Sequence, residues 1–371
     1  MLLLLLACEP AADSGPRYSR RPPDDADADT DSDADADSDA DSDADSDADA
    51  DTDADGGCPE GITCIDHFPW YGSDDTTTST RTDFDTYSCA TDTDESGPEQ
   101  VYRLTIPADG FLSTNLNDRG DDVDAHILSA LDPDACVDRG NFAAASWVAA
   151  GTWYVVIDSW VDGGGTAHPG AYDLWLNVTT PDAYVAEGLD SHVLGLGLTA
   201  FDTAWKSGDT DRFEYTIIDF SRPSDEHRQW TFDLADGSLL YSLLVAHGEG
   251  SGSDTDPRYA DKFSNEDGSH MSSLGLMRTA GRFTGSHGTS LTLQGLEPGI
   301  NDAVEAREII VHGADYATQA FVDEYGYLGR SWGCPAVDPD VVDDLVGDVE
   351  DGSLYWSYYP DPAFLSGSTY L

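Results

Sequence analysis

The chain has 371 residues, which is enough for two domains that each bury a core of their own. Its 73 acidic residues against 17 basic ones give a formal net charge of -56, which argues against nucleic acid as a partner because the phosphates would be repelled. Nine histidines are present, but no His-Glu-x-x-His pattern or similar ligand cluster occurs, so we expect neither a metal site nor another cofactor.

The N-terminus resembles an export signal. Leu5-Leu-Ala-Cys8 follows a run of leucines and resembles a bacterial lipobox, in which the cysteine is acylated. The run is short and no lysine or arginine precedes it, so an apolar terminus without this role stays open. The polar segment that follows favours a lipoprotein signal at 1–8. We therefore expect an exported protein that is lipid-anchored through Cys8, at the periplasmic face of the outer membrane.

The next segment, residues 9–57, is dominated by aspartate. From Asp24 to Asp55 almost every second residue is Asp, with Ala, Ser or Thr between. Such a run has no apolar surface to bury and carries like charges, which predicts a disordered, extended linker. Its 32 residues would span about 100 Å at full extension.

The cysteines divide into a set that can pair and one left over. Cys58, Cys64, Cys89 and Cys136 form an even set, and disulfides persist in exported proteins. Four cysteines allow three pairings, and closeness along the chain favours 58 with 64 and 89 with 136. Cys334 then has no partner. An unpaired thiol in an oxidising compartment suggests that the thiol is used, although buried free cysteines also occur.

Residues 58–180 contain short apolar-alternating runs between Gly, Asp and Pro residues, a pattern typical of an antiparallel β-sandwich. The runs lie at 101–106, 111–116, 124–128, 151–157 and 171–178. Their order resembles bacterial prepeptidase C-terminal domains, which are sandwich modules of secreted enzymes, through the segments 109–112, 122–128, 151–156 and 170–174. A calcium site on Asp121, Asp122 and Asp124 is conceivable, but a solvated acidic turn is the simpler interpretation.

A connector with helical character is expected over 181–210, followed by a second domain over 211–371. Runs at 213–220, 230–234 and 238–245, with an Asp236-Gly turn, predict a β-meander. A further strand at 308–312 has His312 at its end, and the stretch up to Tyr327 has room for a short helix. Together these runs predict a mainly β protein with a few short helices.

His312 and Cys334 are the strongest candidates for chemistry. A thiol is a weak nucleophile and a thiolate a strong one, so a cysteine nucleophile needs a basic neighbour. A histidine at a strand end can take the thiol proton and return it to a leaving amine. Gly333 lets the backbone approach a substrate, so the amides of Gly333 and Cys334 can hold an oxyanion. From spacing alone, a core histidine and a buried thiol remain an equal alternative.

Residues 216–356 resemble the catalytic family of L,D-transpeptidases (YkuD-like), in its murein branch. The agreeing segments are 217–224, 245–248, 263–265, 272–275, 293–297, His312-Gly-Ala-Asp-Tyr316 and Gly329-Arg-Ser-Trp-Gly-Cys-Pro-Ala-Val337. The resemblance implies Cys334 as nucleophile, His312 as base and Ser331 as the residue that shapes the turn. In the family pattern Ser-x-Gly-Cys, x is usually His and here is Trp332. Ala336 stands where Arg is often found, which leaves the contact to the donor carboxylate unassigned.

The implied reaction is cysteine acyl transfer on peptidoglycan. The thiolate attacks a tetrapeptide stem at its third residue, releases the terminal D-alanine, and passes the acyl group to a side-chain amine of a neighbouring stem. Attack by water instead would make the protein an L,D-carboxypeptidase. A third possibility is a non-catalytic lipoprotein that attaches the membrane to the cell wall. The implied partners are peptidoglycan stem peptides and, through the lipid, a membrane.

Residues near these motifs are candidates for binding the substrate: His247, Gly313, Arg330, Trp332 and Ser273. His247 either lines the substrate groove or is a hydrogen-bonded structural residue. Arg330 either holds a substrate carboxylate or pairs with a nearby acid. Trp332, beside the nucleophile, is expected to be partly exposed in the cleft.

Overall fold

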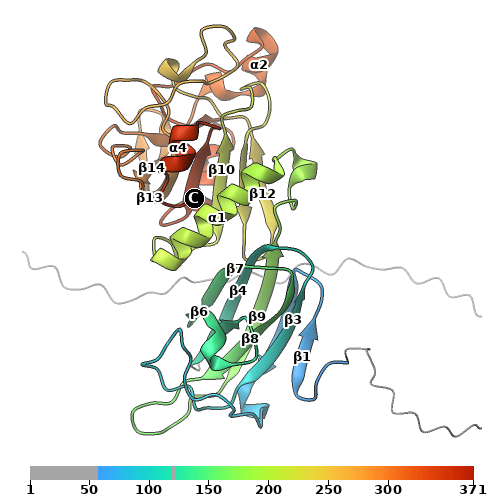
Figure 1. The fold of residues 1–371 in the computed structure, drawn as a ribbon. Helices are drawn as coiled ribbons and strands as arrows, with labels where there is room; N and C mark the ends of the chain where they lie inside the picture. The colour runs from blue at the N-terminus through green and yellow to red at the C-terminus, as the bar shows by residue number, and fades with distance from the viewer. Residues whose placement is uncertain (1–56, 119–121) are drawn as a thin grey trace, which may run out of the picture. The chain divides into compact units, whose positions relative to one another are not determined.

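The computed structural model describes residues 57–118 and 122–371 (Figure 1). The expected signal at 1–8 with Cys8, the linker up to residue 56, and Asp121 lie outside the described residues. Residues Cys58–Leu371 form one compact unit that is mainly β, which confirms the predicted fold class. None of the helices in these described ranges has the length and apolar character that crossing a membrane requires.

The first part of this unit is a β-sandwich. One sheet has the order β1 (Ile62–Ile65), β3 (Gln100–Ile106), β8 (Gly151–Ser159), β5 (Val123–Leu128), β6 (Cys136–Gly140). The other has the order β2 (Trp70–Asp75), β9 (Ala171–Thr179), β4 (Gly110–Asp118), β7 (Ala143–Val148). Leu104 and Val155 of the first sheet share a core with Leu112 and Leu174 of the second, so the sheets pack face to face. The five predicted runs coincide with β3, β4, β5, β8 and β9.

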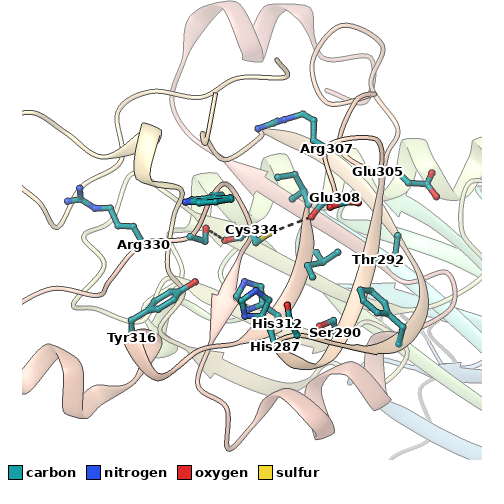
Figure 2. Close-up of a pocket in the computed structure, with 17 residues that line it drawn as sticks. His287, Ser290, Thr292, Glu305, Arg307, Glu308, His312, Tyr316, Arg330 and Cys334 are labelled. Carbon is teal, nitrogen blue, oxygen red and sulfur yellow. Dashed lines mark hydrogen bonds between the residues drawn. The ribbon is translucent and has the colours of Figure 1, made fainter. Parts of the chain in front are cut away.

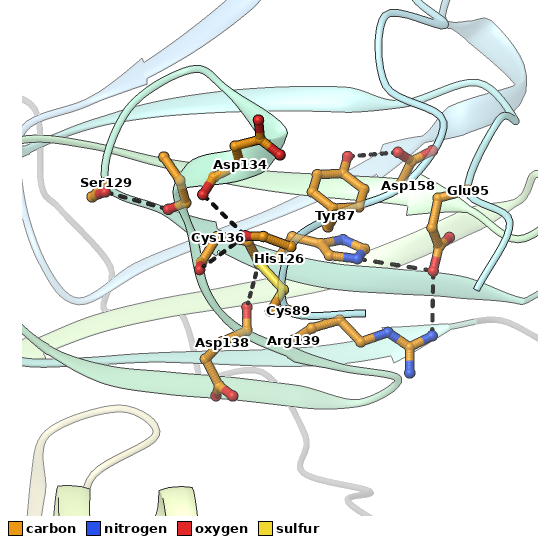
Figure 3. Close-up of a disulfide and its surroundings, with 12 residues drawn as sticks. Tyr87, Cys89, Glu95, His126, Ser129, Asp134, Cys136, Asp138, Arg139 and Asp158 are labelled. Carbon is orange, nitrogen blue, oxygen red and sulfur yellow. Dashed lines mark hydrogen bonds and ion pairs between the residues drawn. A yellow bond between two sulfur atoms is a disulfide. The ribbon is translucent and has the colours of Figure 1, made fainter. Parts of the chain in front are cut away.

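Two disulfides lie in the sandwich part. They join Cys58 to Cys64 and Cys89 to Cys136, which confirms the pairing expected from closeness along the chain. Figure 3 shows the second of these bonds. Among the described cysteines, Cys334 is free.

The second part is built on one eight-stranded sheet. Its order is β12 (Ser238–Leu243), β11 (Gln229–Asp233), β10 (Glu214–Asp219), β17 (Leu354–Tyr358), β13 (Gly275–Gly285), β14 (Gly288–Gly295), β15 (Ile310–Gly313), β16 (Ala336–Val337). Antiparallel pairing of β10, β11 and β12 confirms the predicted meander. Strand β17, from near the end of the chain, lies parallel to β10 in the middle of the sheet. The first and the last strand of the second part are therefore neighbours in the same sheet.

Helix α1 (Ser191–Ser207) covers this sheet beside β10 (Figure 1). The side chain of Asp190 caps its N-terminus by accepting from the amides of His192 and Val193, and Gly208 ends it in the left-handed conformation. Gly197 sits where the helix meets the sheet, because a Cβ there would lie 2.6 Å from Ile217 Cδ1. The remaining helices are α2 (Gln319–Tyr325), α3 (Val342–Val349) and α4 (Pro362–Gly367). Single 3-10 turns lie at Thr76–Thr78, Pro133–Ala135, Val185–Glu187, Glu249–Ser251 and Asp315–Ala317.

The same helix also contacts the sandwich. The Trp205 indole donates to Asp138, at 2.9 Å, and Asp202 accepts from the Trp147 amide, at 2.8 Å. Phe111 of β4 packs edge-on against Phe201 of α1. Helix α1 therefore belongs to the core of the second part and contacts Phe111 and Ala145 of the sandwich there, in keeping with one compact unit over residues 58–371.

The two disulfides are expected to differ in their effect on stability. The bond between Cys89 and Cys136 spans 47 residues and that between Cys58 and Cys64 spans 6. Loop-closure entropy then predicts a loss of about 4 kcal/mol for the double alanine variant of the first and about 2 kcal/mol for that of the second. Urea unfolding of the two variants measures the difference, and an equal or reversed loss would contradict the expectation.

Candidate active site

The register of the catalytic sheet brings His312 and Cys334 to one place. His312 lies in β15, where it pairs with Ser290 of β14 on one side and with Ala336 of β16 on the other. Because Ala336 follows Cys334 by only two residues, the parallel β15–β16 pairing holds the cysteine turn beside the histidine. Both residues line the same pocket, of about 670 Å³ (Figure 2).

Ser331 closes the turn that presents Cys334. Its hydroxyl donates to the carbonyl of Cys334, at 2.6 Å, and accepts from the amide of Gly333, at 3.1 Å. Its own amide donates to the carbonyl of His247, at 3.1 Å, which fastens the turn to the next segment. Gly333 has a φ of 121°, and a Cβ there would lie 2.7 Å from the carbonyl oxygen of Met271. Only glycine fits this position without strain.

The hydrogen bond of His312 sets its tautomer. Its Nδ1 lies 2.9 Å from the carbonyl oxygen of Gly313, and since a carbonyl only accepts, Nδ1 carries the proton. Nε2 is left with a lone pair that can accept a proton from a thiol. Burial first, and then the charge of His287, lower the pKa of His312, while the bond to Gly313 acts in the opposite sense. The imidazole is therefore neutral at neutral pH.

The thiol of Cys334 is also neutral at rest. Burial, the largest effect, raises its pKa, while the amide of Ile310 and the charge of Arg307 lower it. The thiol donates weakly to the carbonyl of Glu308, at 3.7 Å. A neutral thiol beside a neutral imidazole can react only if the proton moves to Nε2 as sulfur attacks, which is general-base catalysis.

Arg307 is a residue of the site that motif reasoning missed. Its guanidinium donates to the carbonyls of Ser264 and Met271 and to the hydroxyl of Ser273, at 2.6 to 2.7 Å. Within residues 57–118 and 122–371, no carboxylate forms an ion pair with it. Although the chain is very acidic, no ion pair neutralises this guanidinium, so its positive charge lowers the pKa of the Cys334 thiol. The available signal was a rare basic residue shortly before the strand that carries His312.

Two of the predicted binding residues line the pocket. Trp332 is 70% exposed, as expected, and its ring stacks on His270 at 4.7 Å and 5° between planes. Arg330 donates to the carbonyl of Pro257, at 2.9 Å, and no ion pair to it occurs among the described residues. Its expected pairing with a nearby acid is therefore not observed there.

The other three predicted binding residues lie behind the pocket lining. His247 is buried, and its Nδ1 accepts from Arg228, at 2.9 Å. Burial and the charges of Arg228 and Arg330 lower the pKa of His247 to about 2, so it is a neutral, hydrogen-bonded residue. Ser273 accepts from Arg307, and Gly313 accepts from His312. These residues support the groups that face the pocket.

A second polar cluster lies buried in the sandwich (Figure 3). Arg139 pairs with Asp124 and Glu95, and the hydroxyl of Tyr87 donates to Asp158, at 2.6 Å. Asp124 is therefore buried and paired with Arg139, so the expected solvated acidic turn is wrong for this residue, and its carboxylate is not free for a calcium ion. No group of three or more potential ligands arranged for a metal ion occurs in the part of the chain that the structure describes.

Residues 185–358 match the family described as L,D-transpeptidase catalytic domain. This segment of the chain belongs to that family. The L,D-transpeptidase domain so matched includes α1, which lies within the connector expected at 181–210, and it contains both His312 and Cys334. None of the curated proteins matches the chain.

Solved structures similar to the chain include those of several L,D-transpeptidases. The enzyme from Mycobacterium smegmatis is 12% identical, over 70% of this chain and 97% of that chain, with a TM-score of 0.26. A mutant of the Enterococcus faecium L,D-transpeptidase is 14% identical, over 39% of this chain and 49% of that chain, with a TM-score of 0.22. The prepeptidase C-terminal domain of Bacillus anthracis collagenase is 14% identical, over 32% of this chain and 97% of that chain, with a TM-score of 0.22.

The charge of Arg307 is expected to control the reactivity of Cys334. In Arg307→Gln the pKa of the thiol rises further, because an uncompensated positive charge is removed, so alkylation by iodoacetamide at pH 8 slows by about threefold to tenfold. Arg307→Lys keeps the charge and should slow the reaction less. Arg258→Gln is the control, since Arg258 is already paired with Asp256 at 2.8 Å. Equal rates in all four proteins would contradict this role.

Gly333→Ala is expected to destabilise the L,D-transpeptidase domain. Its positive φ and the backbone oxygen of Met271 leave no room for a Cβ, at a cost of about 1–3 kcal/mol. Gly347→Ala is the matched control, because Gly347 lies within α3 and a Cβ added there would meet no atom within 4 Å. That change should stabilise the protein by up to about 1 kcal/mol. Denaturant unfolding measures both, and a neutral Gly333→Ala would refute the steric account.

Proposed function

We propose that the chain is a peptidoglycan L,D-transpeptidase, with Cys334 as nucleophile and His312 as general base. The observation that carries the proposal is the β15–β16 register, which holds the Cys334 turn beside a histidine whose Nδ1 proton is bound to Gly313. That arrangement leaves Nε2 as the basic atom. The family match over residues 185–358 supplies the reaction class.

In the first step, Nε2 of His312 takes the proton of Cys334 as the sulfur attacks the carbonyl of the third residue of a tetrapeptide stem. The amide of Cys334 holds the negative charge on the carbonyl oxygen, whereas the amide of Gly333 already donates to Ser331 and so shapes the turn. When the tetrahedral intermediate collapses, the carbon–nitrogen bond breaks and the imidazolium returns its proton to the amine of the leaving D-alanine. The product is a thioester on Cys334, and His312 is neutral again.

In the second step, a neutral side-chain amine of a neighbouring stem attacks the thioester. His312 takes a proton from the attacking nitrogen and passes it to the departing sulfur, so the enzyme returns to the thiol and neutral imidazole. The product is a cross-link between two stems. If water attacks in place of the amine, the product is a trimmed stem, which is the L,D-carboxypeptidase outcome of the same site.

We assign substrate contacts to Trp332 and Arg330, because both line the pocket that contains Cys334 and His312. The unpaired charge of Arg330 suits a carboxylate of the stem peptide. His247, Gly313 and Ser273 are assigned to support rather than to direct contact with the substrate, since each holds a neighbouring group in place.

The setting of the site is outside the cytoplasm. The two disulfides and the cell-wall enzyme family both indicate an extracytoplasmic location. We further propose that Cys8 carries the lipid and that the acidic linker separates the anchor from the domains over 58–180 and 211–371. Such a spacer would let a membrane-anchored enzyme reach the peptidoglycan layer.

Purified muropeptides test the reaction directly. The full chain should convert disaccharide tetrapeptides into cross-linked dimers with release of D-alanine, detected by mass spectrometry. Cys334→Ala should form no product, and Cys334→Ser should lose at least about 100-fold in rate, because a hydroxyl is a far weaker nucleophile than a thiolate. Tripeptides without dimers would establish the carboxypeptidase outcome, and unchanged activity in Cys334→Ala would refute the proposal.

A further inference from the structure

A second imidazole lies against the catalytic base. His287 sits at the tip of the β13–β14 hairpin, between Gly285 and Gly288, and its ring stacks on that of His312 with 4.3 Å between centroids and 28° between planes (Figure 2). The register of the hairpin shifts between Thr279 and Arg282, which places one extra residue in β13. Such a bulge bends and twists a hairpin and redirects its tip.

The two histidines differ in their surroundings. His312 is 2% exposed, whereas His287 is exposed to solvent. Burial therefore disfavours a proton on His312 and lowers its pKa. Two stacked rings also repel each other when both are protonated, so a proton on the outer ring disfavours a proton on the inner one.

The other charged and titratable groups near the stack come from different elements. The pocket that contains both rings is also lined by Tyr316, by Arg330 and Cys334 of the turn, and by Glu305, Arg307 and Glu308 before β15. On the hairpin itself, Arg282 pairs with Glu350, at 3.0 Å. Among the described aromatic side chains, only His287 stacks on His312. Among these groups, His287 is therefore the one whose ring directly contacts the imidazole of His312.

We propose that His287 is a positioning residue for His312, an inference that rests on the proposed role of His312 as base. Its ring covers one face of His312 and keeps the imidazole in the plane in which Nδ1 donates to Gly313 and Nε2 faces the pocket. The stacked ring also disfavours a proton on the buried base, because two imidazoles so close together repel each other when both are charged. The base therefore stays neutral, and able to accept the thiol proton, over a wider range of pH.

Three substitutions of His287 in the full chain separate its two effects. His287→Gln removes the second imidazole, so the NMR titration midpoint of the His312 ring should move up. His287→Lys installs a lasting charge, so the midpoint should move down. The acid limb of kcat/KM should follow the same order, since only neutral His312 accepts the thiol proton. His287→Phe keeps an aromatic face and should retain the maximal rate within about threefold, whereas His287→Gln should lose about threefold to tenfold.

His168→Gln is the matched control, because His168 also stacks on an aromatic ring, that of Trp160 at 5.1 Å, but lies in the sandwich. It should leave the His312 midpoint and the rate unchanged. A midpoint that is the same in the Gln and Lys variants would overturn the electrostatic effect, and equal rate losses in the Phe and Gln variants would overturn the stacking effect. The NMR titration needs no turnover. It therefore separates failure of this inference from failure of the proposed reaction, which Cys334→Ala tests.

Discussion

The parallel pairing of β15 with β16 is the constraint on which the site depends. It aligns His312 with Ala336 and so holds the turn from Ser331 to Cys334 at the edge of the eight-stranded sheet. The hydroxyl of Ser331 then determines the shape of that turn through its two short hydrogen bonds. The placement of the nucleophile beside the base therefore depends on strand pairing as well as on the motif residues themselves.

The electrostatics of the site follow from burial more than from the charge of the chain. Despite a formal net charge of -56, the charges that act on the thiol are few: the guanidinium of Arg307, which is held by neutral oxygens, lowers its pKa, and Glu308 raises it. Burial disfavours both the imidazolium and the thiolate, so the site rests without an ion pair. Arg307 and His287 act on the two reacting groups separately. One favours the thiolate that forms on attack, and the other disfavours premature protonation of the base.

Two aromatic side chains that line the pocket, Trp332 and His287, come from different segments of the chain. Trp332 occupies the position that is usually histidine, and its ring is exposed over the pocket. The imidazole beside His312 comes from the β13–β14 hairpin, a segment that was not predicted as strands because its tip alternates poorly and is rich in glycine. The sequence offered His287 only as one of several histidines that either line the groove or are structural, and it could not place its ring against His312. It did not indicate Arg307, because that residue belongs to neither motif.

The sequence by itself determined the features that depend on residues close together along the chain. Alternating apolar residues defined the sandwich strands and the β10–β12 meander, closeness along the chain favoured the two disulfides, and the His-Gly and Ser-x-Gly-Cys segments singled out His312 and Cys334. Only the tertiary structure decided the insertion of β17 beside β10, the β15–β16 register, the burial of His247 behind the turn, and the stacking of His287 on the base. The physical reason is that alternation specifies which face of a strand is buried, whereas partner and register are chosen by the packing of the whole core, which no local pattern contains.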